Sequence, residues 1–420
     1  KNVHRPARVR SYDQDTGALV LKNEMNFVDL RDYLDISYEV SSDGKATASG
    51  KIDEANIPEI PPGREGKIAL PVAVPDKGRS YLKVFYTLKS PDLFREQGHM
   101  LGFDEIALEN QDPRNQTCLA WQAQGEEAEE KQPRLQVSET LRQLTVKGST
   151  FTYVYNKLYG VFDQLTEGGR EFLDRPMELN VWRAPTDNDM YIKTEWKKAM
   201  YDRAVSRAYV TNYTLTAQYL EIHSKMAMTA VTVQRMMDID TVWRIDNSGQ
   251  IFVKMDVTRN PDFPELPRFG LRLFLPKEMD QVVYFGLGPE ESYVDKRRAA
   301  SHGIYSSDVA GLHEDYLRPQ ENGSHWDCDY VVVSGPGIRI KAYGQTPFSF
   351  NASAFTQEEL AEKNHNFELV PCGSTVWNLD FRQNGIGSNS CGPRLLEKYR
   401  LAEEAFTFSL NLKPEHIKKG

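Results

Sequence analysis

Apolar and polar residues alternate in short runs along most of the chain, which is the pattern of half-buried β-strands. In the first hundred residues these runs occupy residues 7–12, 18–23, 34–40 and 81–88. Asp15-Thr16-Gly17 supplies a turn between the first two. Closely spaced short strands separated by turns are typical of an immunoglobulin-like β-sandwich. We therefore predict such a sandwich over residues 1–108.

Residues 109–134 have a different composition. After Trp121 the segment is polar and acidic, and its apolar residues show almost no period of a helix or a strand. We interpret this segment as a linker or a long surface loop.

From residue 135 onward the strand pattern returns. Examples are residues 143–147, 151–155, 214–219 and 249–257. One helix is predicted at residues 193–207, where Trp196, Ala199, Met200 and Ala204 recur at a spacing of three to four. No repeat period is present, so residues 135–420 are expected to form one large sandwich of two sheets rather than a propeller. The fold class is all-β.

Composition limits the function classes. The 420 residues are 40% apolar and 26% charged, as in globular proteins of two or three domains. A net charge of −9 argues against nucleic-acid binding, and the lack of a long apolar run predicts no membrane span. The four cysteines are scattered and show no zinc spacing. The chain begins with Lys1 rather than methionine, which predicts a processed or shortened chain and leaves its compartment open.

The densest cluster of glycine, proline, aromatic and charged residues lies at residues 284–305. Gly286, Gly288 and Pro289 are expected to force a tight turn after a short strand. Glu291, Tyr293 and Arg297 are expected to hold this loop rigid. A structural role is favoured over a chemical one.

Two further loops carry polar groups. In Arg183-Ala184-Pro185-Thr186-Asp187-Asn188-Asp189, the carboxylates of Asp187 and Asp189 could bind a cation or cap the following helix, and capping is favoured because no calcium-loop spacing is present. The glycine-rich loop at residues 384–393 lacks the Lys-Ser/Thr and the helix of a phosphate-binding loop. Its Cys391 has no histidine nearby in sequence, which disfavours a nucleophilic role.

Four motifs occur together and in order: residues 183–189, residues 284–293 (Tyr-Phe-Gly-Leu-Gly-Pro-Glu-Glu-Ser-Tyr), residues 319–323 (Pro-Gln-Glu-Asn-Gly) and residues 385–387 (Gly-Ile-Gly). Together they resemble the C-terminal part of the β-galactosidases of glycoside hydrolase family 2. That resemblance implies an immunoglobulin-like β-sandwich followed, over residues 135–420, by a large galactose-mutarotase-like β-supersandwich. The opening Arg-Pro-Ala-Arg-Val at residues 5–9 resembles the start of the immunoglobulin-like domain that follows the catalytic barrel there.

This resemblance implies a retaining β-galactosidase that hydrolyses terminal β-D-galactosides with two glutamates, both in the barrel domain. The active-site magnesium is also implied to belong to the barrel, so no cofactor, metal site or catalytic residue is expected in this chain. No eightfold βα alternation is present here, and we therefore expect this chain to be inactive alone. The implied partners are the barrel domain, a β-galactoside or galactose, and further copies in a homo-oligomer.

In the family a tryptophan after the glycine motif reaches the active site and stacks on the sugar. Here Cys391 takes that position, so a stacking platform of about 1–2 kcal/mol is missing. The resemblance implies that Ser388, Asn389 and Cys391 lie at the rim of the substrate site. It implies the same for Met190 and Tyr191, which directly follow Asp189 of the first motif.

Two alternatives come from other classes. A mutarotase-like sugar epimerase needs an acid and a base around the ring, and the available candidates are His223, His302, Glu265 and Glu291. A carbohydrate-binding module would instead use exposed aromatics such as Trp326 or Trp377, although Trp377 is placed between apolar neighbours.

Overall fold

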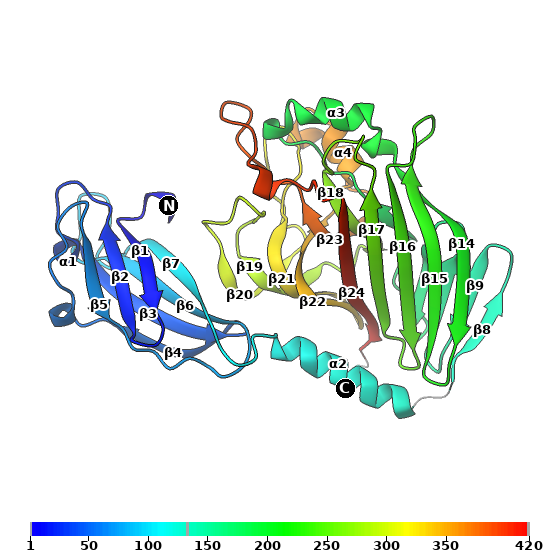
Figure 1. Ribbon diagram of the computed structural model, residues 1–420, viewed down its shortest axis with the longest axis horizontal. Coiled ribbons are helices and arrows are strands. Elements are labelled where there is room, and N and C mark those ends of the chain that lie inside the picture. The colour runs from blue at the N-terminus through cyan, green and yellow to red at the C-terminus, as the bar shows by residue number, and fades with distance from the viewer. Residues whose placement is uncertain (1, 132–133, 418–420) are drawn as a thin grey trace. The chain divides into compact units, whose positions relative to one another are not determined.

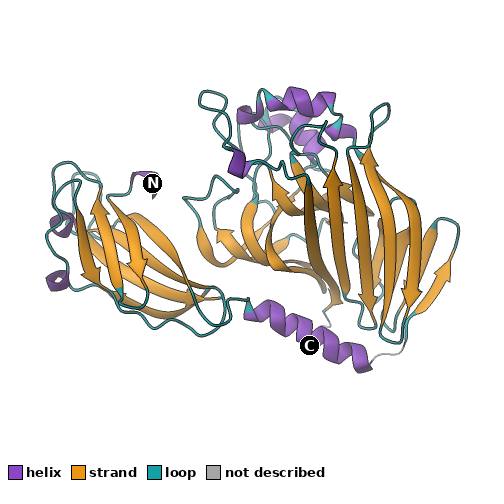
Figure 2. Ribbon diagram, in the orientation of Figure 1, coloured by secondary structure: helices purple, strands orange, loops and turns teal. Residues whose placement is uncertain are grey.

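The computed structural model describes residues 2–131 and 134–417, and strands dominate both parts of the chain (Figures 1 and 2). The internal contacts divide the chain into two compact units. Unit 1 comprises residues 1–119 and the segment 298–304, and unit 2 comprises residues 120–297 and 305–420. The class is all-β: an immunoglobulin-like sandwich followed by a β-supersandwich.

Unit 1 contains seven strands in two antiparallel sheets. The three-stranded sheet has the order β1-β2-β5 and the four-stranded sheet the order β4-β3-β6-β7. The strands are β1 (Ala7–Asp13), β2 (Ala18–Asn23), β3 (Leu34–Ser42), β4 (Lys45–Lys51), β5 (Glu65–Ala69), β6 (Ser80–Leu88) and β7 (Met100–Leu108), with the short helix α1 at Leu30–Tyr33. Alternate residues of β2, such as Leu19 and Leu21, are fully buried, and so are Ile36 and Val40 of β3. The period of two in the sequence therefore directs alternate side chains into the space between the sheets.

Unit 2 contains two larger sheets. A five-stranded sheet has the order β12-β11-β10-β9-β8, and nine strands of a twelve-stranded sheet follow the order β13-β18-β23-β22-β24-β17-β16-β15-β14. The remaining three, β19, β20 and β21, join this sheet through the pairing of β21 with β22. The smaller sheet consists of β8 (Gln136–Glu139), β9 (Gln143–Lys147), β10 (Phe151–Asn156), β11 (Val161–Glu167) and β12 (Arg170–Glu171).

The strands of the larger sheet are long. They are β13 (Arg175–Asn180), β14 (Val205–Leu215), β15 (Tyr219–Thr229), β16 (Met237–Asp246), β17 (Ile251–Arg259), β18 (Arg268–Pro276), β19 (Gln281–Gly288), β20 (Ser301–Asp308), β21 (His325–Gly335), β22 (Ile338–Ser353), β23 (Ser374–Gln383) and β24 (Ala405–His416). Their inward-facing residues form one apolar core with the smaller sheet, in which the ring of Phe162 on β11 meets that of Trp243 on β16 edge-on at 5.0 Å. The opposite face of β15, β16 and β17 carries polar and charged residues.

A helix occupies most of the segment for which a linker or surface loop was expected. Helix α2 extends over Gln116–Lys131, and the side-chain oxygen of Asn115 accepts from the amide of Thr117 at its start. Its glutamine, alanine and glutamate residues have high helix propensity. The sequence pattern missed it because the helix needs no continuous apolar face; Trp121 makes its main contact, against Tyr330 and Tyr343.

The helix predicted over residues 193–207 is about half as long as expected. Helix α3 covers Ile192–Lys198, a 3-10 turn covers Tyr201–Arg203, and β14 already begins at Val205. Met200 takes a left-handed conformation with φ of 60°, which ends the helix. The expected apolar positions Trp196 and Ala199 are buried.

The strand expected at residues 214–219 is a hairpin turn instead. Strand β14 ends at Leu215 and β15 begins at Tyr219. The hydroxyl of Thr216 accepts from the amides of Gln218 and Tyr219 and thereby closes the turn.

None of the four cysteines forms a disulfide. Helix α4 (Gln357–Glu362) completes the set of helices in the described ranges. Among those ranges, no helix combines the length and apolar character needed to cross a bilayer.

Candidate functional site

The four sequence motifs meet in unit 2 around the loop that follows β23. We call this loop, residues 384–393, the glycine loop. The guanidinium of Arg183 is completely buried and donates to the carbonyls of Asn384 and Gly385, the latter at 3.1 Å. The first motif therefore holds the start of the fourth, about two hundred residues further along the chain.

Asp189 orients that arginine. Its carboxylate accepts from Arg183 Nη2 at 2.8 and 3.0 Å, and from the amide and hydroxyl of Thr186 at 2.9 and 3.1 Å. Thr186 and Asp189 form a capping box around the 3-10 turn Asp187–Asp189, which confirms the capping interpretation for Asp189. Asp187 is exposed and contacts Gln320 of the third motif, with its amide 3.1 Å from Gln320 Oε1.

Asp295, just after the second motif, and Asn188 of the first motif also hold the glycine pair of the loop. Asp295 accepts from the amides of Ile386 at 2.9 Å and Gly387 at 2.7 Å. Asn188 donates to the carbonyl of Gly387 at 2.8 Å. Gly387 has φ of +67°, a conformation that side chains rarely adopt, so this position requires glycine. Sequence reasoning did not single out Asp295 or Asn188, although both lie inside or beside recognised motifs.

The tip of the glycine loop, residues 388–393, has fewer contacts than its base. The hydroxyl of Ser390 donates to Asn188 Oδ1 at 2.7 Å, and the amide of Gly392 donates to the carbonyl of Ser388. Ser388 and Cys391 are exposed and Asn389 is half-buried. Met190 and Tyr191, directly after the first motif, are 40% and 63% exposed. Asn188 thus connects the two segments that were expected to form the rim.

Glu291 is the centre of a buried cluster that ties the second motif to the third. Its carboxylate accepts from the amide of Gly323 at 3.0 Å and from the hydroxyl of Tyr293 at 3.3 Å, and it also contacts Lys296 and Tyr316. Arg297, expected to take part, is exposed, and the cation that pairs with Glu291 is Lys296. Burial raises the pKa of Tyr293 well above its usual value, which keeps its hydroxyl a donor.

The two glycines of the second motif are required by close packing. A Cβ on Gly286 would lie 2.3 Å from Cys328 Sγ, and one on Gly288 would lie 2.2 Å from the hydroxyl of Tyr284. Strand β19 continues through Gly286 to Gly288, so the tight turn expected from Gly286 onward begins later, at Pro289. The Gly288–Pro289 peptide bond is cis.

Beneath the motifs lies a buried ionic network centred on Arg268 of β18. Arg268 contacts Glu321 at 3.0 Å and Asp380 at 2.5 and 3.1 Å, and all three side chains are fully buried. Asn351 supplies a further acceptor at 3.1 Å. Burial raises the pKa of Asp380 to about 6; the charge of Glu321 adds to this rise, and the guanidinium of Arg268 opposes it.

His325 is buried below the turn of the second motif. Its Nδ1 lies 3.0 Å from the hydroxyl of Tyr284 and 3.3 Å from the carbonyl of Leu287, and its Nε2 has no hydrogen-bond partner among the described residues. Burial lowers its pKa to about 4, so the imidazole is neutral near pH 7.

The structure gives the epimerase candidates separate surroundings. His223 Nε2 lies 2.7 Å from Glu221, His302 Nδ1 lies 2.6 Å from Glu105 within unit 1, and Glu265 faces Arg394 and Arg400. Glu291 belongs to the buried cluster described above. No acid–base pair is formed from these four residues.

The aromatic candidates for a binding module differ in exposure. Trp377 is fully buried in the core and cannot stack on a sugar, whereas Trp326 is half-buried. Over the described part of the chain, no group of three or more histidine, cysteine, aspartate or glutamate side chains could hold a metal ion.

Comparisons with known proteins agree with the motifs. A family described as "Beta galactosidase small chain" matches residues 147–412, and one described as "Beta-galactosidase, domain 4" matches residues 19–109. A β-galactosidase of Actinobacillus pleuropneumoniae is 37% identical over 98% of this chain and 39% of its own length. A β-galactosidase of Staphylococcus xylosus is 31% identical over 98% of this chain and 40% of its own.

The chain therefore spans about two fifths of the length of these curated relatives. Among solved structures, a galactose 1-epimerase from Lactobacillus acidophilus aligns with 68% of this chain and 99% of its own, at 9% identity and a TM-score of 0.38.

Proposed function

The chain belongs to the β-galactosidase family as its fourth domain and small-chain domain, and on this premise we propose that it completes the active-site rim of a retaining β-galactosidase. In this proposal the chain supports the hydrolysis of terminal β-D-galactosides without supplying a catalytic residue. The catalytic glutamates and the magnesium belong to a barrel domain, which is the partner of this chain.

The observation that supports this proposal is the contrast within the glycine loop. Its base is fixed by Arg183, Asp295 and Asn188, whereas its tip and the adjacent Met190 and Tyr191 are exposed. A loop that is held firmly at its base and exposed at its end can present side chains to a bound molecule at low entropic cost.

The tip offers hydroxyl, amide and thiol groups and no aromatic ring. Tyr191, 63% exposed, is an aromatic in the adjoining segment. We infer that Tyr191, rather than Cys391, supplies apolar contact to the sugar or its leaving group, and that Ser388 and Asn389 supply hydrogen bonds.

Complementation tests the proposal directly. The 420-residue chain is mixed with the barrel-containing remainder of the A. pleuropneumoniae β-galactosidase, and cleavage of a chromogenic β-galactoside is measured. We expect no cleavage by either part alone and cleavage by the mixture. Cleavage by this chain alone, or no cleavage by a mixture in which both parts are folded and associated, would overturn the proposal.

The rim assignment has its own test in the active mixture. Tyr191→Ala is expected to raise KM about three- to tenfold with little change in kcat, because it removes contact with bound sugar. The matched control is Phe367→Ala, which truncates an aromatic that is 81% exposed elsewhere in unit 2. Equal effects of the two variants would remove Tyr191 from the rim.

We also propose that these domains contribute to a homo-oligomer of the full-length enzyme. Sedimentation of the active mixture measures this, and a complex with a single copy of each part would contradict it.

A further inference from the structure

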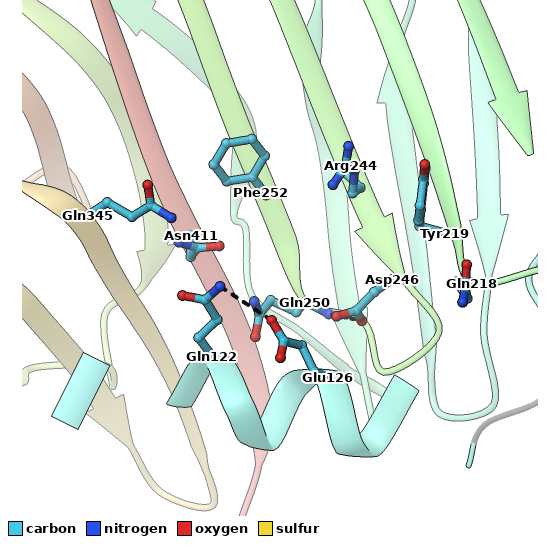
Figure 3. A pocket seen from close by; sticks show the side chains of 10 residues that line it. All are labelled: Gln122, Glu126, Gln218, Tyr219, Arg244, Asp246, Gln250, Phe252, Gln345 and Asn411. Atoms are coloured by element: carbon cyan, nitrogen blue, oxygen red, sulfur yellow. Dashed lines mark hydrogen bonds between the residues drawn. The ribbon is translucent and has the colours of Figure 1, made fainter. Parts of the chain in front are cut away.

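A cleft of about 460 Å³ lies between helix α2 and the polar face of the larger sheet in unit 2 (Figure 3). Its lining consists of Gln122, Glu126, Gln218, Tyr219, Arg244, Asp246, Gln250, Phe252, Gln345 and Asn411. The cleft is separate from the rim, because the two lie at different positions along the strands of the sheet. Asn411 lies in the second half of β24, whereas the glycine loop precedes the start of that strand.

Strand register assembles the floor of the cleft. Arg244 pairs with Phe252 across β16 and β17, and Phe252 pairs with Asn411 across β17 and β24. Residues that are paired across antiparallel strands project from the same face of the sheet. A guanidinium, a half-buried phenyl ring and a carboxamide therefore stand in one row, although Asn411 is distant in sequence from Arg244 and Phe252.

Two turns close one end of the cleft. Asp246 accepts from the hydroxyl of Ser248 at 2.7 Å and from the amide of Gln250 at 2.9 Å, which fixes the turn between β16 and β17. Gln218 and Tyr219 come from the hairpin between β14 and β15.

Helix α2 forms the opposite wall and is anchored to the sheet. The ring of Trp121 lies 5.1 Å from that of Tyr330 and has Lys341 Nζ over its face at 4.8 Å. Gly125 is buried, and a Cβ there would lie 2.6 Å from Gln250 Oε1. Next to these anchors, Gln122 and Glu126 face the strands, joined by a hydrogen bond of 3.4 Å (Figure 3).

The lining has the chemistry of a site for a neutral polyhydroxyl compound. Five carboxamides provide both donors and acceptors, and the side-chain amides of Gln250 and Gln345 make no hydrogen bond with the described residues. The face of Phe252 offers an apolar surface among these groups, as one face of a sugar ring requires.

Anionic ligands are disfavoured by the charges already present. Arg244 is paired with Glu221 at 2.7 Å and lies over the ring of Tyr219 at 4.4 Å, so its charge is already compensated. Glu126 and Asp246 repel an anion, and no cluster of metal-binding side chains is found here in the described residues.

We propose that this cleft is a second, non-catalytic saccharide site that binds neutral mono- or disaccharides by stacking on Phe252 and hydrogen bonding to Gln250, Gln345 and Asn411. This site does not depend on the rim or on the proposed function, because its recognition uses other residues on another part of the sheet.

Saturation-transfer NMR on the full chain tests the proposal, with lactose and maltose as neutral probes and inorganic phosphate as the anionic probe. We expect saturable transfer to the disaccharides and none to phosphate. Phe252→Ala and Gln345→Ala should each weaken binding about three- to tenfold. Phe367→Ala and Gln281→Ala, which truncate the same residue types elsewhere on unit 2, should leave it unchanged.

Gln345 is exposed, so its truncation tests binding without a folding defect, and the melting curve of each variant is recorded alongside. The proposal is overturned if neither disaccharide binds saturably, if phosphate binds instead, or if binding survives both cleft substitutions. It is also overturned if Tyr191→Ala, rather than the cleft variants, abolishes binding; that result would place the sugar at the rim. Failure of galactoside cleavage in the complementation assay leaves this binding measurement unaffected.

Discussion

The base and the tip of the glycine loop are neighbours in sequence but differ in almost every physical respect. The base begins with the buried residues Asn384 and Gly385, and Arg183 and Asp295 hold it through charged hydrogen bonds. Asp380 of β23, the strand that leads into the loop, pairs with the buried Arg268. The tip is exposed and is held mainly through Asn188. Buried charges are costly to leave unpaired, whereas exposed polar groups exchange their partners for water at little cost. Stability should therefore depend on the base, and ligand contacts can vary at the tip.

The largest expected loss of stability follows from removing the buried guanidinium of Arg268. Arg268→Ala leaves Glu321 and Asp380 buried without their partner and should lower the free energy of unfolding by about 3–5 kcal/mol. Urea unfolding followed by tryptophan fluorescence measures unit 2 alone, because all six tryptophans lie there. Arg235→Ala, which removes an exposed pair with Asp238, should cost less than about 1 kcal/mol. Similar losses in the two variants would contradict a dominant role for the base.

The next largest expected effect is a loss of stability in acid, through the buried His325. The unfolded chain takes up a proton on His325 near its usual pKa of 6.5, whereas the folded chain does so only near 4. The folded pKa is depressed, so the unfolded state binds more protons between these values, and the free energy of unfolding falls as pH falls from about 6.5 to about 4. We expect this residue to contribute about 2–3 kcal/mol over that window.

His325→Gln should flatten this part of the pH dependence, and His365→Gln, at an exposed histidine, should not. An unchanged slope in His325→Gln would assign the acid sensitivity to other groups.

Glu291 should have a smaller effect on stability than the Arg268 network. Glu291→Ala leaves the buried Gly323 amide without its acceptor and removes the carboxylate that pairs with Lys296, and it should cost about 1–3 kcal/mol. Arg297→Ala, at an exposed residue of the same loop, should change stability by less than about 0.5 kcal/mol. Unchanged melting of Glu291→Ala, with turnover lost in the complemented enzyme, would show that this loop serves chemistry before structure.

Substitutions at the tip should have the smallest effect on stability and the largest effect on ligand binding. Cys391→Trp places an indole at the exposed end of the loop and should change the free energy of unfolding by less than about 0.5 kcal/mol. In the complemented enzyme it should lower KM up to about tenfold by adding a stacking surface. Cys391→Ala is the control and should change neither quantity. A large loss of stability in Cys391→Trp would show that the tip is more constrained than its exposure indicates.

Local patterns in the sequence were sufficient for much of this molecule. The alternation of apolar and polar residues predicted strands in both units. Thr186 and Asp189 have the spacing of a capping box in the sequence itself. The four motifs identified the family. These features depend on neighbours within a few residues, where side-chain period and backbone preference act directly.

Tertiary structure alone decided which distant groups meet. Nothing near Arg183 in sequence shows that it holds Gly385, and nothing near Arg268 shows that it pairs with Glu321 and Asp380. Helix α2 was missed because its stability as an element of the fold comes from Trp121 docking on the sheet rather than from an apolar stripe. The cleft beneath it depends on strand register, since a shift of one residue would turn Phe252 into the core.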